Sequence, residues 1–414
     1  MKELWLFTSR FPFGMGESFL ENELPVLCAR FEKVIIYPEH ADGAVRPVPP
    51  NAEIRLPIRD PYARASLAQA WRSRAVIFRL LRALWKDSPS IAALRAQWPE
   101  LRSRIFQLLH RAEVLHQVVL REYDPEGVVI YSYWTHDWVT VLSMVRRRIP
   151  KMDFFSRAHG FDLYEAQNRD RWIPFRSFQL EHVSRIYCVS GLGQQHLQRV
   201  HPDHKDLFQL SRLGTRDHGA GPMPLKGPLH VVSCSFLIPR KRVLDLVQAL
   251  SLVRTEVRWT HFGGGKEEKQ VRTAAAGLPK NVSVHLHGDT PNSELMKWYT
   301  TQPVDVFVHL SALEGGVAVA VQEAASFGIP LICADSGGVR DIVGPRTGLL
   351  LPNEIRHGEV AMILDGLRDG PMGTAAFRQG VREAWREGFE ANMAFNRFVD
   401  EVLDWHFRRS HPSG

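Results

Sequence analysis

The residues with the clearest chemical potential surround a glycine-rich turn late in the chain. Glu314 precedes Gly315 and Gly316, and Glu323 follows in an apolar pattern that predicts a helix. Backbone amides at such a turn, together with the positive end of the helix, form a site for a phosphate. A carboxylate on either side of that site can hold sugar hydroxyls. The segment therefore predicts a pocket for a nucleotide sugar.

Two further glycine-rich turns follow predicted strands. One contains Gly14 and Gly16, and the other contains Gly264. A single glycine after a strand usually serves tight packing. The shared position of these turns favours ligand binding, because ligands of open α/β sheets bind at the carboxyl ends of the strands.

A basic run formed by Arg240, Lys241 and Arg242 also follows a predicted strand. A cation there would lie at the same sheet edge as the glycine turns, where it could neutralise a departing diphosphate. The alternative is a solvated charged face, which is the commoner role of an isolated basic run. Beside a phosphate-binding turn we favour the functional role.

A histidine segment in the first half of the chain follows another predicted strand. Its residues His159 and Asp162 could bind or orient hydroxyls, and Arg157 could hold a phosphate. A structural role is the alternative for His159. Glu17 and His136 follow two other strands and are expected at the acceptor for the same topological reason.

No metal-binding motif accompanies these residues. The 18 histidines include no His-Glu-x-x-His sequence, and no Asp-x-Asp sequence follows a strand. A Walker lysine motif and a Gly-x-Ser-x-Gly elbow are also missing from the sequence. We therefore expect a metal-independent transfer without a cofactor, in which the nucleoside diphosphate sugar is a co-substrate and cations and amides stabilise the leaving group.

Apolar strands alternate with helical patterns in both halves of the chain, which predicts an α/β fold with two parallel sheets in tandem. A Gly/Pro-rich stretch at 214–228 is typical of an interdomain linker. We expect an N-terminal domain at 1–215, a C-terminal domain at 216–391, and a final helix within 392–414 that packs back on the first domain. The expected strands lie at 4–8, 34–37, 128–131, 154–155, 186–189, 230–235, 257–262, 282–287, 304–309 and 330–334.

The positive charge of the chain is concentrated in one region. The formal net charge is +7, while residues 61–121 contain 11 Lys or Arg against 3 Asp or Glu, a difference of +8. On a helix turning about 100° per residue, four of these cations fall within an arc of about 80°, opposite an apolar side. They are Arg72, Arg79, Arg82 and Lys86.

Two interpretations of this basic region remain open. It is either an ordinary helix with a solvated face or a surface that contacts an anionic membrane. Trp71, Trp85 and Trp98 favour the membrane because they add interfacial residues to the charge. Nucleic acid is not expected as a partner, since no recognised binding motif accompanies the charge.

The cysteine pattern and hydropathy bear on the cellular compartment. The 4 cysteines are widely spaced without a Cys-x-x-Cys pair, which indicates buried thiols in a reducing compartment. No apolar run approaches the roughly 18 residues that span a bilayer. We expect a cytoplasmic protein, and any contact of the basic region with the inner face of the cell membrane would be peripheral.

Four segments together resemble the family 4 glycosyltransferases, retaining enzymes of GT-B fold that use nucleotide-sugar donors. The similarity covers almost the whole chain except about 61–120. The resemblance implies two Rossmann-like doubly wound domains facing each other across a cleft. The segments are EGGVAVAVQEAASFGIPLICADSGGVRDIV, FLIPRKRVLDLVQAL, SRAHGFDLY and FPFGMGESFLENEL.

The resemblance also implies roles for individual residues. Glu323 would bind the donor ribose, and Lys241 with Arg240 or Arg242 would stabilise the leaving group. His159 would lie near the anomeric carbon. Glu314 and the amides of Gly315, Gly316 and Val317 would hold the transferred sugar and the diphosphate. Gly14 and Gly16 would let the first loop approach the phosphates.

Two departures from the family pattern concern the donor site. Eight residues separate Glu314 from Glu323, whereas the family has seven, so either the turn carries an inserted glycine or Gly315 occupies the first glutamate's place. Phe236 stands where many members have an arginine. The neighbouring Arg240 and Arg242 are expected to compensate.

The implied function is retaining transfer by a hexosyltransferase-type enzyme in surface polysaccharide biosynthesis, whether exopolysaccharide, capsule or lipopolysaccharide. The acceptor would be a saccharide or a lipid-linked saccharide. Two alternatives stay open: a sugar-nucleotide epimerase of the same fold, and a catalytically degenerate scaffold of a polysaccharide assembly complex.

Overall fold

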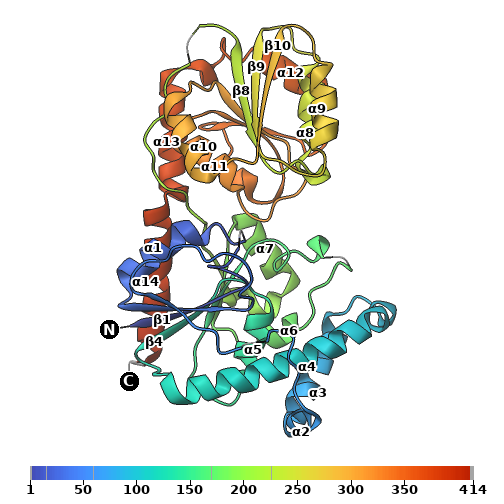
Figure 1. Cartoon of the computed structure of the whole chain (residues 1–414), viewed down its shortest axis with the longest axis vertical. Coiled ribbons are helices and arrows are strands. Elements are labelled where there is room, and N and C mark those ends of the chain that lie inside the picture. Colours follow the sequence, from blue (N-terminus) through green and yellow to red (C-terminus); the bar gives the residue numbers. More distant parts are fainter. Residues whose placement is uncertain (1, 15, 59, 169, 225, 411–414) are drawn as a thin grey trace. The chain divides into compact units, whose positions relative to one another are not determined.

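The chain folds into two compact units, each with its own sheet and core (Figure 1). The computed structural model describes residues 2–14, 16–58, 60–168, 170–224 and 226–410. The first unit contains residues 1–211 and 395–414, and the second contains 212–394. Residues 212–215 pack with the second unit, because Thr215 pairs with Glu390 and Arg212 donates to Asp341. No helix among the described residues is long and apolar enough to cross a membrane.

The first unit is built on a seven-stranded sheet whose strands all run parallel. Alternate residues of its first strand face opposite sides, with Trp5 and Phe7 in one apolar core and Leu4 and Leu6 in another. Both faces are therefore covered by helices, as a parallel sheet requires. In spatial order the strands are β3 (Ala52–Ile54), β2 (Lys33–Pro38), β1 (Glu3–Thr8), β4 (Val128–Ser132), β5 (Phe155–Ala158), β6 (Arg185–Cys188) and β7 (Phe208–Leu210).

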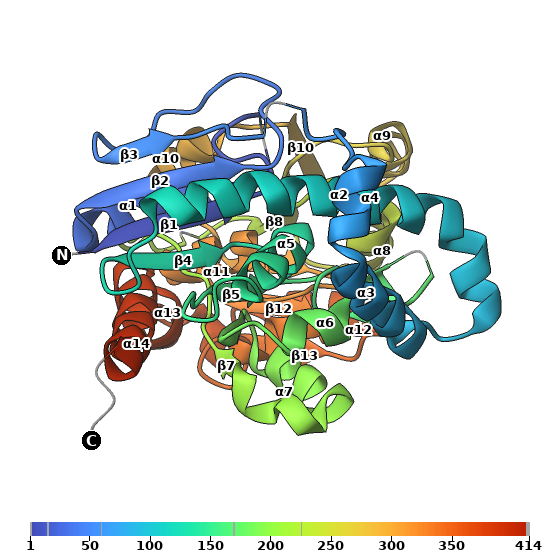
Figure 2. The same ribbon diagram turned by 90° about the horizontal axis from the view of Figure 1, so that it is seen from below.

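The helices of the first unit include the last helix of the chain. Phe398, Val399 and Val402 of that helix belong to the core on one face of the sheet. Figure 2 shows the long helix α4 running across this unit. The helices are α1 (Leu20–Arg30), α2 (Leu67–Arg72), α3 (Arg74–Asp87), α4 (Ile91–Glu122), α5 (Asp137–Arg146), α6 (Arg176–Leu180), α7 (Gly191–Val200) and α14 (Ala391–Ser410).

The second unit contains a parallel sheet of six strands with helices on both faces. The adjacent residues Val231 and Val232 enter the two different cores. In spatial order the strands are β10 (Val282–Gly288), β9 (Val257–Phe262), β8 (Leu229–Cys234), β11 (Val306–His309), β12 (Leu331–Ala334) and β13 (Gly348–Leu351). The helices are α8 (Val243–Leu250), α9 (Glu268–Ala276), α10 (Asn292–Thr301), α11 (Val319–Ser326), α12 (His357–Asp365) and α13 (Ala375–Phe389). The predicted α/β class with two Rossmann-like sheets is confirmed.

The basic region differs from its expected form in two respects. Helix α2 ends at Arg72 and α3 begins at Arg74, so Arg72 does not share a helix with the other three cations. The part of α4 from Leu101 onward contributes to the core of the first unit, because Leu101, Leu108 and Leu115 are buried there. Only α2, α3 and the start of α4 form the outer part of the region.

Candidate donor and acceptor sites

The strand order of each sheet reverses at one position. In the second unit the reversal lies between β8 and β11, and in the first unit between β1 and β4. Loops at the carboxyl ends of such neighbouring strands diverge and leave a crevice where ligands of doubly wound sheets bind. Most of the predicted site residues follow one of these four strands.

Glu314 and Lys241 meet at the reversal point of the second unit. Lys241 ends a short 3-10 turn after β8, and its ammonium group pairs with the Glu314 carboxylate. The same carboxylate oxygen accepts a hydrogen bond from Nε2 of His309, the last residue of β11, at 2.9 Å. Although burial favours the neutral acid, these two partners lower the pKa of the Glu314 carboxyl to about 2. Glu314 is therefore an anion that holds Lys241 in place.

A glycine permits the close approach that positions Glu314. Gly337 has a φ of +55°, and a Cβ atom built on it would lie 1.9 Å from the carbonyl oxygen of Glu314. This distance is far inside van der Waals contact. The turn after β12 can therefore pack on the backbone of Glu314 only if residue 337 has no side chain.

Glu323 lies in α11 in a different electrostatic environment. Its side chain accepts a hydrogen bond from Nδ2 of Asn292 at 2.7 Å, and the residue is only 7 % exposed. Burial without a cationic partner raises the pKa of the Glu323 carboxyl to about 7. The pKa values of the two glutamates of the predicted motif therefore shift in opposite directions, because only Glu314 has His309 and Lys241 beside its carboxylate.

The turn between the glutamates leads into α11. Among the described residues, the amides of Gly316 and Val317 donate to no acceptor, whereas Gly315 has an interaction of its own. The Val317 carbonyl accepts a hydrogen bond from Gln322 at 3.0 Å, which fixes the turn against the helix. Within the described chain, the arrangement leaves two amides without an acceptor between Glu314 and the start of α11.

The other predicted donor residues have different surroundings. Arg240 is exposed, and Arg242 adopts a φ of +52° and donates to the Asn353 side chain at 2.9 Å. The Gly264 amide donates to the carboxylate of Asp289 at 2.8 Å. A ligand would have to displace this carboxylate to use the amide, and donor binding by Gly264 stays a prediction.

A cavity of about 230 Å³ lies at the reversal point of the first unit. The carboxylate of Glu17 organises its wall by accepting hydrogen bonds from three consecutive amides, of Ser9, Arg10 and Phe11, at 2.9, 2.7 and 2.6 Å. It also accepts from the indole of Trp134 at 2.6 Å. Glu17 therefore shapes the loop after β1 as well as lining the cavity. The lining consists of Ser9, Arg10, Gly16, Glu17, Glu39, Trp134, His136, Asp137, Trp138 and Phe161.

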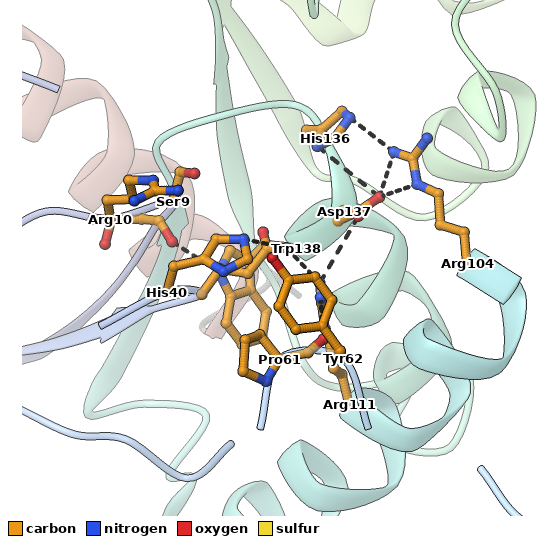
Figure 3. Close-up of polar contacts among 12 residues, drawn as sticks. Ser9, Arg10, His40, Pro61, Tyr62, Arg104, Arg111, His136, Asp137 and Trp138 are labelled. Atoms are coloured by element: carbon orange, nitrogen blue, oxygen red, sulfur yellow. Dashed lines mark hydrogen bonds and ion pairs between the residues drawn. The ribbon is translucent and has the colours of Figure 1, made fainter. Parts of the chain in front are cut away.

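His136 is held at this cavity by a charged network (Figure 3). Nη2 of Arg104 donates to Nε2 of His136 at 2.8 Å, and Nε of Arg104 donates to Asp137 at 2.8 Å. Because a guanidinium only donates, the His136 ring must present a lone pair at Nε2. Arg111 extends the network to Glu39 at 2.7 Å. The arrangement orients a neutral imidazole at the wall of the cavity.

His159 packs between two aromatic rings beside this wall. Its ring centroid lies 4.6 Å from that of Tyr133 and 4.3 Å from that of Trp134. Both ring nitrogens are buried, and neither has a hydrogen-bond partner among the described residues. Asp162 accepts the amides of His159 and Thr135 at 2.8 and 2.9 Å, so its carboxylate organises the loop. Asp162 is fully buried, which is at odds with direct contact to an acceptor.

Arg157 is also at odds with its expected role. Its side chain has no exposed surface, and it donates to Glu23 at 3.0 Å and to the hydroxyl of Tyr131 at 2.7 Å. The guanidinium lies inside the first unit and presents no open face to a phosphate. Arg157 is therefore a core residue in this structure.

The two glycines of the first loop serve different purposes. Gly14 has a φ of +61° and donates its amide to Ala44 at 2.9 Å. Gly16 lines the cavity, and its carbonyl accepts from Arg46. Only Gly16 therefore contacts the cavity.

His309 and Asn292 bind the carboxylates of Glu314 and Glu323, and neither is among the predicted site residues. His309 ends β11, and its position at the carboxyl end of a predicted strand was a signal that could have found it. Asn292 begins α10, and nothing in its local sequence indicates that it contacts Glu323.

Two parallel sheets with residues of this kind at their reversal points define a nucleotide-binding α/β protein of the GT-B type. The segment 224–372 matches the model of the family described as glycosyl transferases group 1. It contains Lys241, Glu314 and Glu323. The resemblance to the family 4 glycosyltransferases is thereby confirmed.

Curated relatives are similar to parts of the chain. The amylovoran biosynthesis glycosyltransferase AmsK of Erwinia amylovora is 23 % identical over 186 residues, which are 44 % of this chain and 46 % of AmsK. A GDP-mannose-dependent alpha-mannosyltransferase of Mycobacterium tuberculosis is 48 % identical over 123 residues, 29 % of this chain and 30 % of the relative. The chain thus spans about half the length or less of the curated relatives it matches.

Solved structures resemble almost the whole chain. The apo form of the lipopolysaccharide outer core galactosyltransferase WaaB superimposes with a TM-score of 0.69, covering 96 % of this chain and 99 % of WaaB at 13 % identity. HepE of Anabaena in complex with UDP gives a TM-score of 0.67, covering 98 % and 100 % of the two chains at 16 % identity. At such identities the likeness shows the fold, which is that of the GT-B glycosyltransferases.

Proposed function

We propose that the protein is a retaining glycosyltransferase of bacterial surface polysaccharide biosynthesis. It moves a hexosyl group from a nucleoside diphosphate sugar to a hydroxyl of a saccharide or lipid-linked saccharide, in the cytoplasm or at the inner face of the membrane. The observation that carries the proposal is the cluster of Lys241, Glu314 and His309 beside the amides of Gly316 and Val317, within the segment that matches the family.

The cluster suits the stabilisation of a leaving diphosphate. A lysine ammonium has three donors, and Lys241 uses one of them on Glu314, so two remain for phosphate oxygens. The adjacent amides of Gly316 and Val317 add neutral donors near the start of α11. A preorganised set of this kind stabilises charge that develops when the sugar–phosphate bond breaks.

The remaining steps follow from the same donor set. A diphosphate oxygen held by Lys241 takes the proton of the acceptor hydroxyl, and the new bond forms on the face from which the diphosphate leaves. The bond from the anomeric carbon to the diphosphate breaks, and the bond to the acceptor oxygen replaces it with retained configuration. Glu323 accepts from the donor ribose. No metal takes part in this scheme.

A binding and turnover experiment tests the proposal. UDP-, GDP-, ADP- and dTDP-sugars are compared by thermal shift, because a ligand that binds only the folded protein raises its unfolding temperature. The panel includes GDP-mannose and UDP-glucose, since relatives and structural neighbours name these donors or their nucleotides. Product formation is then followed with and without EDTA, and the anomeric configuration is read by NMR.

Lys241→Met is the decisive variant, with Lys269→Met on an exposed part of α9 as its control. We expect the first to abolish product formation while it leaves the fold intact, and the second to have no effect. Undiminished turnover in Lys241→Met would sink the assignment of this residue. Conversion of the donor without any acceptor would indicate an epimerase, and absence of stabilisation by every donor would indicate a scaffold.

A further inference from the structure

Helix α3 carries two exposed stripes of different chemistry. Residues at a spacing of three and then four positions lie on one side of a helix, and a second set displaced by one position lies about 100° away. The first stripe is apolar and aromatic, and the second is basic. Their members are Phe78, Leu81 and Trp85 in the first, and Arg79, Arg82 and Lys86 in the second.

The aromatic stripe is separate from the side of α3 that packs on the protein. Leu80 and Leu84 are buried in the core of the first unit, where α3 contacts α4 and α6. Phe78 is 69 % exposed and Trp85 is 65 % exposed. The apolar residues were expected opposite the cations, and the structure adds a second apolar stripe next to the cations. Large aromatic residues exposed in a row indicate a surface that contacts something else.

The exposed aromatic surface continues into α2. Trp71 is 71 % exposed, and the guanidinium carbon of Arg74 lies 5.3 Å from the centre of its ring. The large hydrophobic residues that the structure shows as exposed include three tryptophans, Trp71 in α2, Trp85 in α3 and Trp98 in the first turns of α4. Figure 1 shows α2 and α3 protruding beside α4 in the first unit. We call this surface, residues 67–87, the α2–α3 surface.

The basic stripe of this surface is not neutralised by the protein. Within the described chain, Arg82 and Lys86 form no ion pair with a carboxylate, and Arg79 approaches Glu181 only to 3.8 Å between half-exposed side chains. The carboxylate of Asp87, the single acidic residue of the segment, accepts from the Ser177 amide at 3.2 Å. An open hollow is lined by Arg74, Ala75, Phe78, Arg79 and Arg82. Several cations therefore converge where a phosphate could lie.

We propose that the α2–α3 surface docks the protein on an anionic phospholipid membrane. Trp85 and Phe78 enter the interfacial region, where aromatic rings are favoured, while the neighbouring basic stripe contacts lipid phosphates. Charge complementarity selects an anionic lipid surface over a neutral one. The inference rests on the proposed function in one respect, because this surface would bring the enzyme to a lipid-linked acceptor. The docking itself involves no residue of the donor site and requires no sugar transfer.

Vesicle sedimentation of the full chain tests the docking. The vesicles contain phosphatidylcholine alone or phosphatidylcholine with phosphatidylglycerol, and no sugar nucleotide is present. We expect binding to the anionic vesicles only, and release by salt. The charge variant Arg79→Gln/Arg82→Gln/Lys86→Gln should bind about 100-fold more weakly, since each cation near an anionic surface is worth roughly fivefold in affinity. The aromatic variant Phe78→Ser/Trp85→Ser should lose at least about tenfold.

The control variant Arg254→Gln/Met362→Ser removes an exposed cation and an exposed apolar residue from the second unit. It should bind like the unaltered chain. Equal binding to neutral vesicles, or equal losses in the control, would overturn the proposal. A second outcome would also overturn the proposal. If the protein never binds vesicles but self-associates, and the α3 variants abolish this self-association, the surface joins two copies of the chain.

A readout at the donor site separates this proposal from the proposed function. Thermal stabilisation by sugar nucleotides should be the same in the α3 variants and the unaltered chain. Vesicle binding without sugar-nucleotide binding would contradict the proposed glycosyltransferase function and would support the proposed membrane-docking surface. Quenching of tryptophan fluorescence by brominated lipid should decrease in Trp85→Phe, and unchanged quenching would contradict insertion of this ring.

Discussion

Arg157 and Glu23 form an ion pair inside the first unit in which neither side chain is exposed to solvent. Nη2 of Arg157 lies 3.0 Å from Oε1 of Glu23. The guanidinium carbon also lies 4.5 Å from the ring centre of Phe398 in α14. The pair therefore links β5 to α1 and to the C-terminal helix, so we assign it a role in stabilising the fold.

We expect Arg157→Met to lower the free energy of unfolding by about 3–5 kcal/mol, because it leaves a buried carboxylate without its cation. The double variant Arg157→Met/Glu23→Gln should recover much of this loss, since it removes the charge as well as its partner. Urea denaturation measures both variants. Arg346→Met is the control, because it breaks an ion pair with Glu387 that lies on the surface, and it should leave the unfolding curve unchanged. A loss no larger than in this control would contradict the structural role.

Arg157 shows where prediction from sequence ends. The strand before it could be recognised from apolar residues, and all ten expected strands overlap strands of the structure. The direction of the Arg157 side chain depends on a carboxylate 134 residues away in the chain. No local sequence pattern indicates such a pairing. The same holds for Glu323, whose role as a buried carboxyl depends on Asn292 in another helix.

The α3 helix shows a second limit of the sequence. Periodicity correctly indicated a helix with a basic side. It could not distinguish Leu80 and Leu84, which are buried, from Phe78 and Trp85, which are exposed, because all four are apolar. Which apolar side faces the core depends on where α4 and α6 lie, and this is tertiary information.

Gly337→Ala should disturb the donor site. The added methyl group would overlap the Glu314 carbonyl at 1.9 Å, and the φ of +55° is unfavourable for alanine. We expect displacement of Glu314 and at least about a tenfold loss of donor affinity, measured by calorimetry. Gly344→Ala is the matched control, because a Cβ atom there meets no atom within 4 Å. Equal donor affinity in both variants would show that the approach of Gly337 to Glu314 does not position the site.

Glu323→Gln should stabilise the protein at neutral pH. The pKa of Glu323 is raised to about 7 in the folded chain, whereas the unfolded group keeps its ordinary value of 4.5. A raised pKa means that the contribution of the acid to stability is fully present below pH 4.5 and is lost as the pH rises through 7. The neutral amide escapes this loss, which amounts to up to about 3 kcal/mol. Urea unfolding at several pH values should show the gain of the variant growing from pH 5 to pH 8, and a gain independent of pH would contradict the buried carboxyl.

The corresponding change at the other glutamate should have the opposite sign. The pKa of Glu314 is lowered to about 2 in spite of its burial, because His309 and Lys241 favour the anion. Its stabilising contribution is therefore present above pH 4.5 and is lost as the pH falls through 2. Glu314→Gln should reduce the free energy of unfolding by up to about 3 kcal/mol at pH 7, and the deficit should shrink as the pH is lowered below 4.5.

Urea unfolding of the Glu314→Gln and Glu323→Gln proteins side by side tests both charge states with one substitution chemistry. If Glu314→Gln proved as stable as the unaltered chain at pH 7, Lys241 and His309 would not be paired with an anion in the folded state. The proposed preorganisation of Lys241 would then lose its physical basis, because the cation would have no fixed carboxylate to hold it beside the amides of Gly316 and Val317. Opposite signs in the two variants would instead assign the anionic role to Glu314, although an extra residue separates it from Glu323.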